Sequence, residues 1–188
     1  MKHLVAFLLL AFITSCSSVV SKYAVGLEDH SIIAGEWNGT WFNENETIKI
    51  HVMDESKGII ALAWIEHSQK GFKFESMTCQ IKRGKNWLYA NVLEIPNEKV
   101  DGYYWGKLKK ENRRILLWLP SAEAFREAAE AQQTNAIVDV THSTKLKMET
   151  TETVKLLDNP EKIVNLIEIS GSKFFQWEDP IVLIQTKY

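Results

Sequence analysis

The sequence predicts a mainly β protein, an antiparallel meander that closes toward a barrel and carries two short helical inserts. Two observations predict this fold class. Apolar and polar residues alternate through several segments that turns of about four or five residues connect, and connections this short pair each strand with the one before it. Two segments in the last third of the chain instead show the apolar period of a helix.

Six strand-like segments follow one another in the first two thirds of the chain. The first alternates apolar Ile48, Ile50 and Val52 with polar residues, which is the pattern of a strand with one face in water. Because each segment begins soon after the previous one ends, the six are expected to form neighbouring strands. The other five occupy residues 59–67, 72–81, 87–95, 100–110 and 115–120.

The third of these segments changes its apolar face part of the way along. Phe72 and Phe74 share one face of a strand, whereas Met77 and Cys79 share the other. A β-bulge inserts one residue and so reverses the alternation. The pattern therefore predicts a bulge near residues 75–76.

Two helices interrupt the β pattern in the last third of the chain. Residues 122–133 have a narrow, alanine-rich apolar stripe, and Ser121 before them is a suitable N-cap. Asn159 followed by Pro160 predicts the start of the second helix. The remaining strand-like segments are residues 137–142, residues 146–156 and a closing strand at 180–187.

The first fifteen residues have the features of a signal peptide. Lys2 supplies a positive charge, and residues 4–13 form an unbroken apolar run. This run is too short to span a bilayer core, which needs about 20 residues, but it has the length of the apolar region of an export signal. The sequence thus predicts a signal peptide at 1–15, a lipidated N-terminus and tether at 16–33, and a single β-rich domain at 34–188.

Residues 13–16, Ile-Thr-Ser-Cys, resemble the lipobox of bacterial lipoproteins, in which the cysteine is lipidated and becomes the first residue. The resemblance implies that Cys16 is lipidated and that a membrane is a partner, held stably because more than one acyl chain inserts. Ser17 stands where an aspartate often signals retention in the inner membrane. The resemblance therefore implies the outer membrane facing the periplasm, or the cell membrane of a single-membrane organism. The alternative is an ordinary secretory peptide cut near Ser15, with Cys16 as a chance thiol.

Composition limits the classes of protein. Cys79 is the only cysteine besides Cys16, so a lipidated Cys16 leaves no intrachain disulfide and the fold must rest on an apolar core. Cys79 itself is expected to be a buried apolar side chain. The hydrophobic fraction of 45% is sufficient for one core. The net charge of −2 provides no basic surface, so no nucleic acid is expected as a partner.

Residues 35–41, GEWNGTW, begin the predicted domain. Their Gly-x-Trp start resembles that of lipocalin-type barrels, in which the tryptophan closes one end and a basic residue after the last strand packs across it. The resemblance implies a lipocalin-like barrel with Trp37 as a structural plug and Lys187 as its cover. The helix after residue 120 and the missing disulfides depart from that pattern. The whole layout also resembles small bacterial lipoproteins of unassigned activity, which implies a fold and a compartment only.

The densest aromatic group, residues 102–106 (GYYWG), is the candidate contact for a ligand or a partner. Tyr103 and Trp105 share one strand face, and Tyr104 takes the other. Because Lys107 and Lys109 continue the first face, that face is expected to emerge into water at its lysine end. The seven tryptophans of the chain either line a cavity, stack on a ligand or pack the core.

No catalytic pattern stands out in the sequence. The histidines are scattered, with no pair at the spacing of zinc ligands, and no G-x-S-x-G motif occurs. Ser170 and Lys173 have the spacing of a Ser-Lys nucleophile pair, but their place at a helix end predicts a C-cap. The protein is predicted not to be an enzyme and to carry no cofactor or metal.

Three functions are compatible with a lipid-anchored β domain. The first is a carrier or sensor that binds a small apolar ligand or an envelope component, since a barrel of about eight strands can hold one small ligand. The second is an interaction module for envelope assembly, or for inhibition of an envelope-directed enzyme, without a ligand cavity. The third, an esterase or hydrolase, requires a triad assembled from distant residues.

Overall fold

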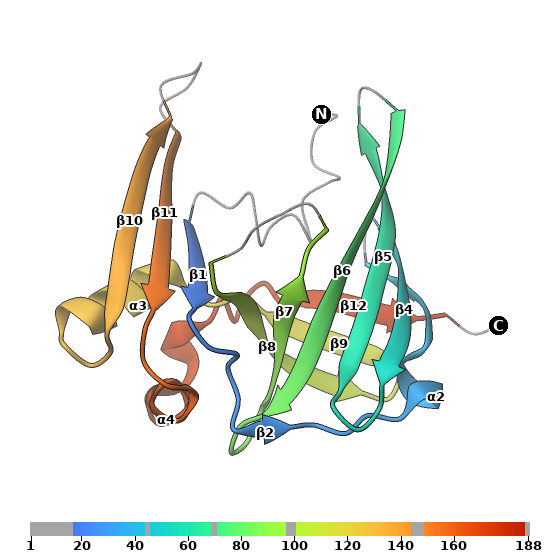
Figure 1. Cartoon of the computed structure of the whole chain (residues 1–188), viewed down its shortest axis with the longest axis horizontal. Helices are drawn as coiled ribbons and strands as arrows, with labels where there is room; N and C mark the ends of the chain where they lie inside the picture. Colours follow the sequence, from blue (N-terminus) through green and yellow to red (C-terminus); the bar gives the residue numbers. More distant parts are fainter. Residues whose placement is uncertain (1–16, 44–45, 69–70, 97–100, 144–148, 187–188) are drawn as a thin grey trace.

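Eight strands form a closed antiparallel barrel in the computed structural model, which describes residues 17–43, 46–68, 71–96, 101–143 and 149–186 (Figure 1). The last strand, β12 (Ile181–Gln185), pairs with both β9 and β3 and so closes the barrel. The predicted meander with a closing C-terminal strand is therefore confirmed. The other barrel strands follow in chain order: β3 (Gly39–Phe42), β4 (Thr47–Asp54), β5 (Ile59–Ser68), β6 (Gly71–Arg83), β7 (Leu88–Glu94), β8 (Tyr103–Glu111) and β9 (Arg114–Trp118).

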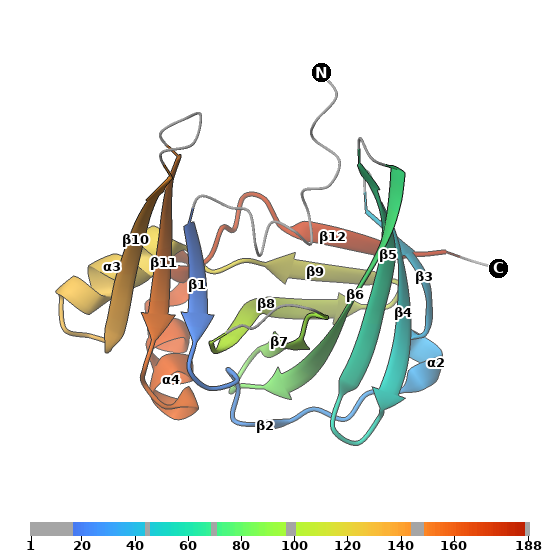
Figure 2. The ribbon, with the colours of Figure 1, turned by 45° about the horizontal axis from the view of Figure 1, so that its top comes forward.

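A smaller sheet extends the barrel wall at β8 (Figures 1 and 2). Its strands are β1 (Ser17–Ser21), β10 (Ala136–Ser143) and β11 (Glu149–Leu156). β1 lies between its neighbours, running parallel to β11 and antiparallel to the start of β8. The strands predicted between the two helices therefore exist, but they lie outside the barrel.

The residues predicted to form a tether, 16–33, belong instead to the folded body wherever the structure describes them. Val19 and Val20 of β1 are buried, and the backbone of β1 is paired on both sides. Farther along, Val25 and Ile32 are buried, and the short β2 (Glu28–Asp29) pairs with β6. Residues 17–21 are thus a paired strand and not a free stalk, because β8 and β11 each offer an edge, and no local sequence signal reveals that pairing.

Three short helices occur within the described residues. α3 (Ala122–Glu130) begins after Ser121, whose hydroxyl accepts a hydrogen bond from the Ala124 N–H. α4 (Pro160–Ser170) begins after Asn159, whose side chain accepts one from the Lys162 N–H. Both predicted N-caps are thus confirmed. The four-residue α2 (Ala34–Trp37) is an addition to the two predicted helices, and a 3-10 turn, η1 (Gly171–Phe174), follows α4.

Two apolar cores lie on opposite faces of the wall that β7, β8 and β9 form. The first core fills the barrel and includes Trp41 and Trp64. The second lies outside the barrel, where α3, α4 and η1 cover the outward side chains Tyr89, Trp105 and Trp118. The helices and the small sheet therefore bury the aromatic side chains on the outer face of β7, β8 and β9, which would otherwise face water.

The apolar face changes within β6 without a bulge at the predicted place. The β5–β6 register is continuous across residues 75–76, and the shift in β6 falls after Thr78, on the β7 side. Alternation stays regular, so Met77 lies in the barrel core while Phe72 and Phe74 lie on the outer face and are exposed. The predicted bulge is therefore wrong. The apolar residues change face because those near the start of β6 lie on the outer surface of the barrel, whereas those farther along lie in its core.

Candidate functional site

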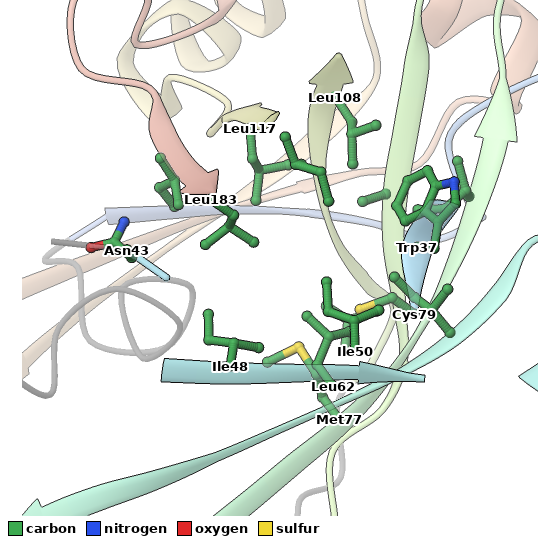
Figure 3. A pocket seen from close by; sticks show the side chains of 16 residues that line it. Trp37, Asn43, Ile48, Ile50, Leu62, Met77, Cys79, Leu108, Leu117 and Leu183 are labelled. Atoms are coloured by element: carbon green, nitrogen blue, oxygen red, sulfur yellow. The ribbon is translucent and has the colours of Figure 1, made fainter. Parts of the chain in front are cut away.

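A cavity of about 60 Å³ lies inside the barrel (Figure 3). Aliphatic side chains form most of its wall, and no charged residue lines it. Because an apolar wall offers no compensation to a buried charge, the cavity can stabilise only apolar groups. The residues labelled in Figure 3 along the wall include Ile48, Ile50, Leu62, Leu108 and Leu183.

Trp37 lies on one side of the cavity, opposite Asn43 (Figure 3). Trp37 is the last residue of α2 and is 3% exposed. Its carbonyl oxygen accepts a hydrogen bond of 2.9 Å from Nε1 of Trp41, which ties α2 to the first barrel strand. This is the placement that a plug requires. The stabilising role of Trp37 stays a prediction, and Lys187 lies outside the described residues.

Asn43 is the one hydrogen-bonding amide side chain among the residues that line the cavity. Its Nδ2 donates to the Val182 carbonyl at 3.3 Å, and its backbone N–H donates to the Glu46 carbonyl at 3.0 Å. Its Oδ1 is buried and has no hydrogen-bond partner among the described residues. In Figure 3 this oxygen points away from the other side chains of the wall, so Asn43 offers the interior of the cavity no free acceptor.

Cys79 contributes its side chain to the cavity wall, next to Met77. The predicted burial of Cys79 is confirmed, and burial raises the pKa of its thiol to about 12. At neutral pH the thiol is therefore uncharged, and the thiolate that attacks electrophiles is scarce. Cys79 acts as part of the apolar wall.

The aromatic group GYYWG does not form an exposed face at Trp105. This residue is 0% exposed and packs edge-to-face on Tyr89, Phe125 and Phe175, with ring centroids 6.2, 5.8 and 5.9 Å away. The face that Tyr103 and Trp105 share is thus covered at Trp105 and Lys107, and the expected emergence into water occurs only at Lys109, farther along β8. α3 and the residues just after η1 cover that face, which removes Trp105 as a ligand or partner contact.

Tyr103 and Tyr104 lie at the start of β8 and are half-buried. They pair with Ser21 and Val20 of β1, and Tyr104 also packs against the barrel core. The small sheet therefore covers one edge of this group. A contact of Tyr103 or Tyr104 with a ligand or partner stays a prediction.

Lys107 lies in an aromatic cage that the sequence analysis did not predict. The Nζ atom is 3.2 Å from the ring centroid of Trp87, 4.1 Å from that of Trp177 and 5.4 Å from that of Phe175. Burial lowers the pKa of Lys107 to about 8, and the charge of Glu168 opposes this change. The ring faces also stabilise the ammonium form. The cage is therefore already filled by a cation of the chain itself.

The rest of the described chain offers no obvious chemical centre. No group of three or more histidine, cysteine, aspartate or glutamate side chains gathers there in an arrangement that could hold a metal ion. Among the described helices, none has the length and apolar character needed to cross a membrane. The barrel cavity is therefore taken as a candidate ligand site on the strength of its enclosed apolar wall.

Comparison with family models, with curated proteins and with solved structures finds no match for this chain. The barrel is compatible with the lipocalin-like architecture that the Gly-x-Trp start implied. Function follows here from the residues and their geometry.

Proposed function

We propose that the protein is a non-enzymatic lipoprotein of the cell envelope, anchored in the outer membrane and facing the periplasm, whose barrel binds the end of a slender apolar chain. The observation that carries the proposal is the cavity with its apolar wall. Burial of an apolar ligand contributes about 25 cal/mol per Å² removed from water.

The volume of the cavity limits the ligand. About 60 Å³ is well below the roughly 150 Å³ that accommodates benzene and the roughly 300–1,000 Å³ of common small-molecule sites. A thin chain end fits such a space better than a ring system does. Met77 in the wall is unbranched and can change rotamer, so the wall can adapt to a longer chain.

The anchoring part of the proposal is supported by residues 4–16. An apolar run of export-signal length leads directly into the Ile-Thr-Ser-Cys motif. Lipidation at Cys16 would place the protein on a membrane, which is also a source of apolar chains for the cavity. The proposed anchor and the cavity are therefore both consistent with a protein that binds apolar chains at a membrane.

Cys16→Ala is expected to abolish membrane attachment. Cells that express the wild type with radiolabelled palmitate should yield a labelled protein that sediments with the membrane fraction, whereas the variant should be unlabelled and soluble. Cys79→Ala is the matched control, because it removes the other cysteine and should leave labelling intact. A Cys16→Ala protein that still incorporates palmitate and still sediments would refute the anchor.

Leu62→Phe is expected to abolish uptake of a linear apolar chain. The probe is parinaric acid, a slender fatty acid whose fluorescence rises in apolar surroundings, titrated into the full chain. Wild type should show saturable uptake, and the larger side chain in the wall should fill the cavity at a packing cost of about 1–3 kcal/mol. Met53→Phe is the control, because Met53 is exposed on the same barrel. Melting temperatures verify that both variants fold.

The small volume of the cavity favours one other function, the interaction module without a ligand cavity. In that case the barrel is filled by its own side chains, and a partner binds to its outer surface. A folded wild-type protein that shows no saturable uptake of the probe would decide for the interaction module.

A further inference from the structure

The outer surface of the barrel carries an apolar band at one end. Ile184 of β12 lies opposite Phe42 of β3, and Ile65 of β5 lies opposite Phe74 of β6. The polar Thr47 of β4 pairs with Phe42 and lies between the two pairs. These side chains, together with the neighbouring Phe72, are between 43% and 81% exposed. The name apolar band refers to Phe42, Ile65, Phe72, Phe74 and Ile184.

Single exposed apolar side chains are normal on soluble proteins, but the members of the apolar band form two cross-strand pairs, Phe42 with Ile184 and Phe74 with Ile65, on either side of β4. Three of its members are on the β5–β6 hairpin, where Phe74 faces Ile65 across the pair. Large apolar residues grouped in this way indicate contact with another apolar surface, a protein or a membrane. The position of the chain's N-terminus decides between these two.

The hairpin end of β5 and β6 and the start of β1 lie on the same side of the molecule. In Figures 1 and 2, β5 ends and both β6 and β1 begin on the upper side, whereas β4 ends and β5 begins on the lower side. The two views differ by a 45° rotation, so this agreement is not an accident of overlap. β1 therefore begins on the side to which the hairpin projects.

Cys16 directly precedes β1, without an intervening tether. Ser17 is the first residue of β1 and pairs with Glu152 of β11. Since consecutive Cα atoms are about 3.8 Å apart, an acyl group on Cys16 would be attached within a few ångströms of the folded body. Such an anchor keeps the upper side of the molecule close to the lipid surface.

We propose that the apolar band docks onto the bilayer that holds the Cys16 anchor. This inference rests on the proposed lipidation. The anchor raises the effective concentration of lipid at the hairpin, and apolar side chains that reach the boundary between headgroups and acyl chains are buried there. Asn43 directly follows Phe42 of the band, so docking turns the Asn43 side of the cavity toward the lipid and the Trp37 side away from it.

A fluorescent probe at the hairpin tests this docking. Phe72→Cys and Met53→Cys are each labelled with the fluorophore NBD on the mature, acylated full chain, in vesicles of phosphatidylethanolamine and phosphatidylglycerol. Cys79 is buried and does not compete for the label. Relative to the same labelled chain carrying Cys16→Ala in buffer without lipid or detergent, we expect a blue shift and a severalfold loss of iodide quenching at residue 72. Met53 is 60% exposed near the end of β4, on the lower side, and its label should remain fully quenched.

The mass of the same sample separates failure of the anchor from failure of the docking. An acyl mass on Cys16, combined with full quenching at residue 72, overturns the docking and leaves the proposed anchor in place. A chain without acyl mass overturns both. Protection of residue 72 in lipid-free solution, in an oligomer or with a partner protein, overturns lipid docking and assigns the apolar band to a protein contact.

Discussion

Replacing Trp37 with alanine is expected to lower the free energy of unfolding by about 3–5 kcal/mol, the usual cost of truncating a buried tryptophan. Trp37 is 3% exposed and lies in the wall of the cavity. Removal of the indole enlarges an existing void, which adds lost packing contacts to the lost burial. For a chain of this size the melting temperature should fall by on the order of 10 °C, measured by circular dichroism.

Two further variants test whether the loss of stability is specific to the buried indole of Trp37. Lys49→Ala changes an exposed side chain of β4, so its melting temperature should stay close to that of the wild type. Trp37→Phe keeps a ring at the end of the barrel and should lose less stability than Trp37→Ala. Equally small effects of Trp37→Ala and Lys49→Ala would rule out the plug.

The barrel was predictable because its determinants are local. Each inward residue of β4, such as Ile48 or Ile50, is followed by a polar one, and short turns force consecutive strands to pair. The helix starts at Ser121 and Asn159 were predictable for the same reason, since a cap is defined by a few adjacent residues.

The small sheet was not predictable because its determinants are distant in the sequence. β1 pairs in parallel with β11, so Val19 lies beside Val154 although the two residues are far apart in the sequence. The short serine and valine segment 17–21 therefore has the composition of a tether and the structure of a buried strand. Only the complete fold shows that β8 and β11 leave a space for it.

The candidate site was predictable in part. The Gly-x-Trp start of residues 35–41 drew attention to Trp37, which lines the cavity, whereas the cavity itself depends on how sixteen side chains fit together. The error at Trp105 has a similar origin. Lys107 after Trp105 suggested a face in water, but Trp87 and Trp177 surround that lysine from distant parts of the chain.

Trp105→Ala is expected to cost about 3–5 kcal/mol as well, through the second core rather than the barrel. Trp105 is fully buried between β8 and the layer of α3 and η1, and it contacts the rings of Tyr89 and Phe125. Its removal should therefore loosen α3 before the barrel opens. Amide hydrogen exchange should accelerate in residues 122–130 at temperatures where the barrel strands remain protected, and the melting temperature should fall.

The matched variants for Trp105 separate packing from binding. Nε1 of Trp105 has no hydrogen-bond partner among the described residues, so Trp105→Phe removes an unsatisfied donor while keeping a ring, and should cost less than Trp105→Ala. Tyr103→Ala changes a half-buried neighbour and should cost least of the three. A Trp105→Ala protein with the melting temperature of the wild type would contradict the second core. Loss of capture of a periplasmic partner by that same protein would make the aromatic group a binding surface. A side chain that only packs the core affects binding through a loss of stability, which would be absent in this case.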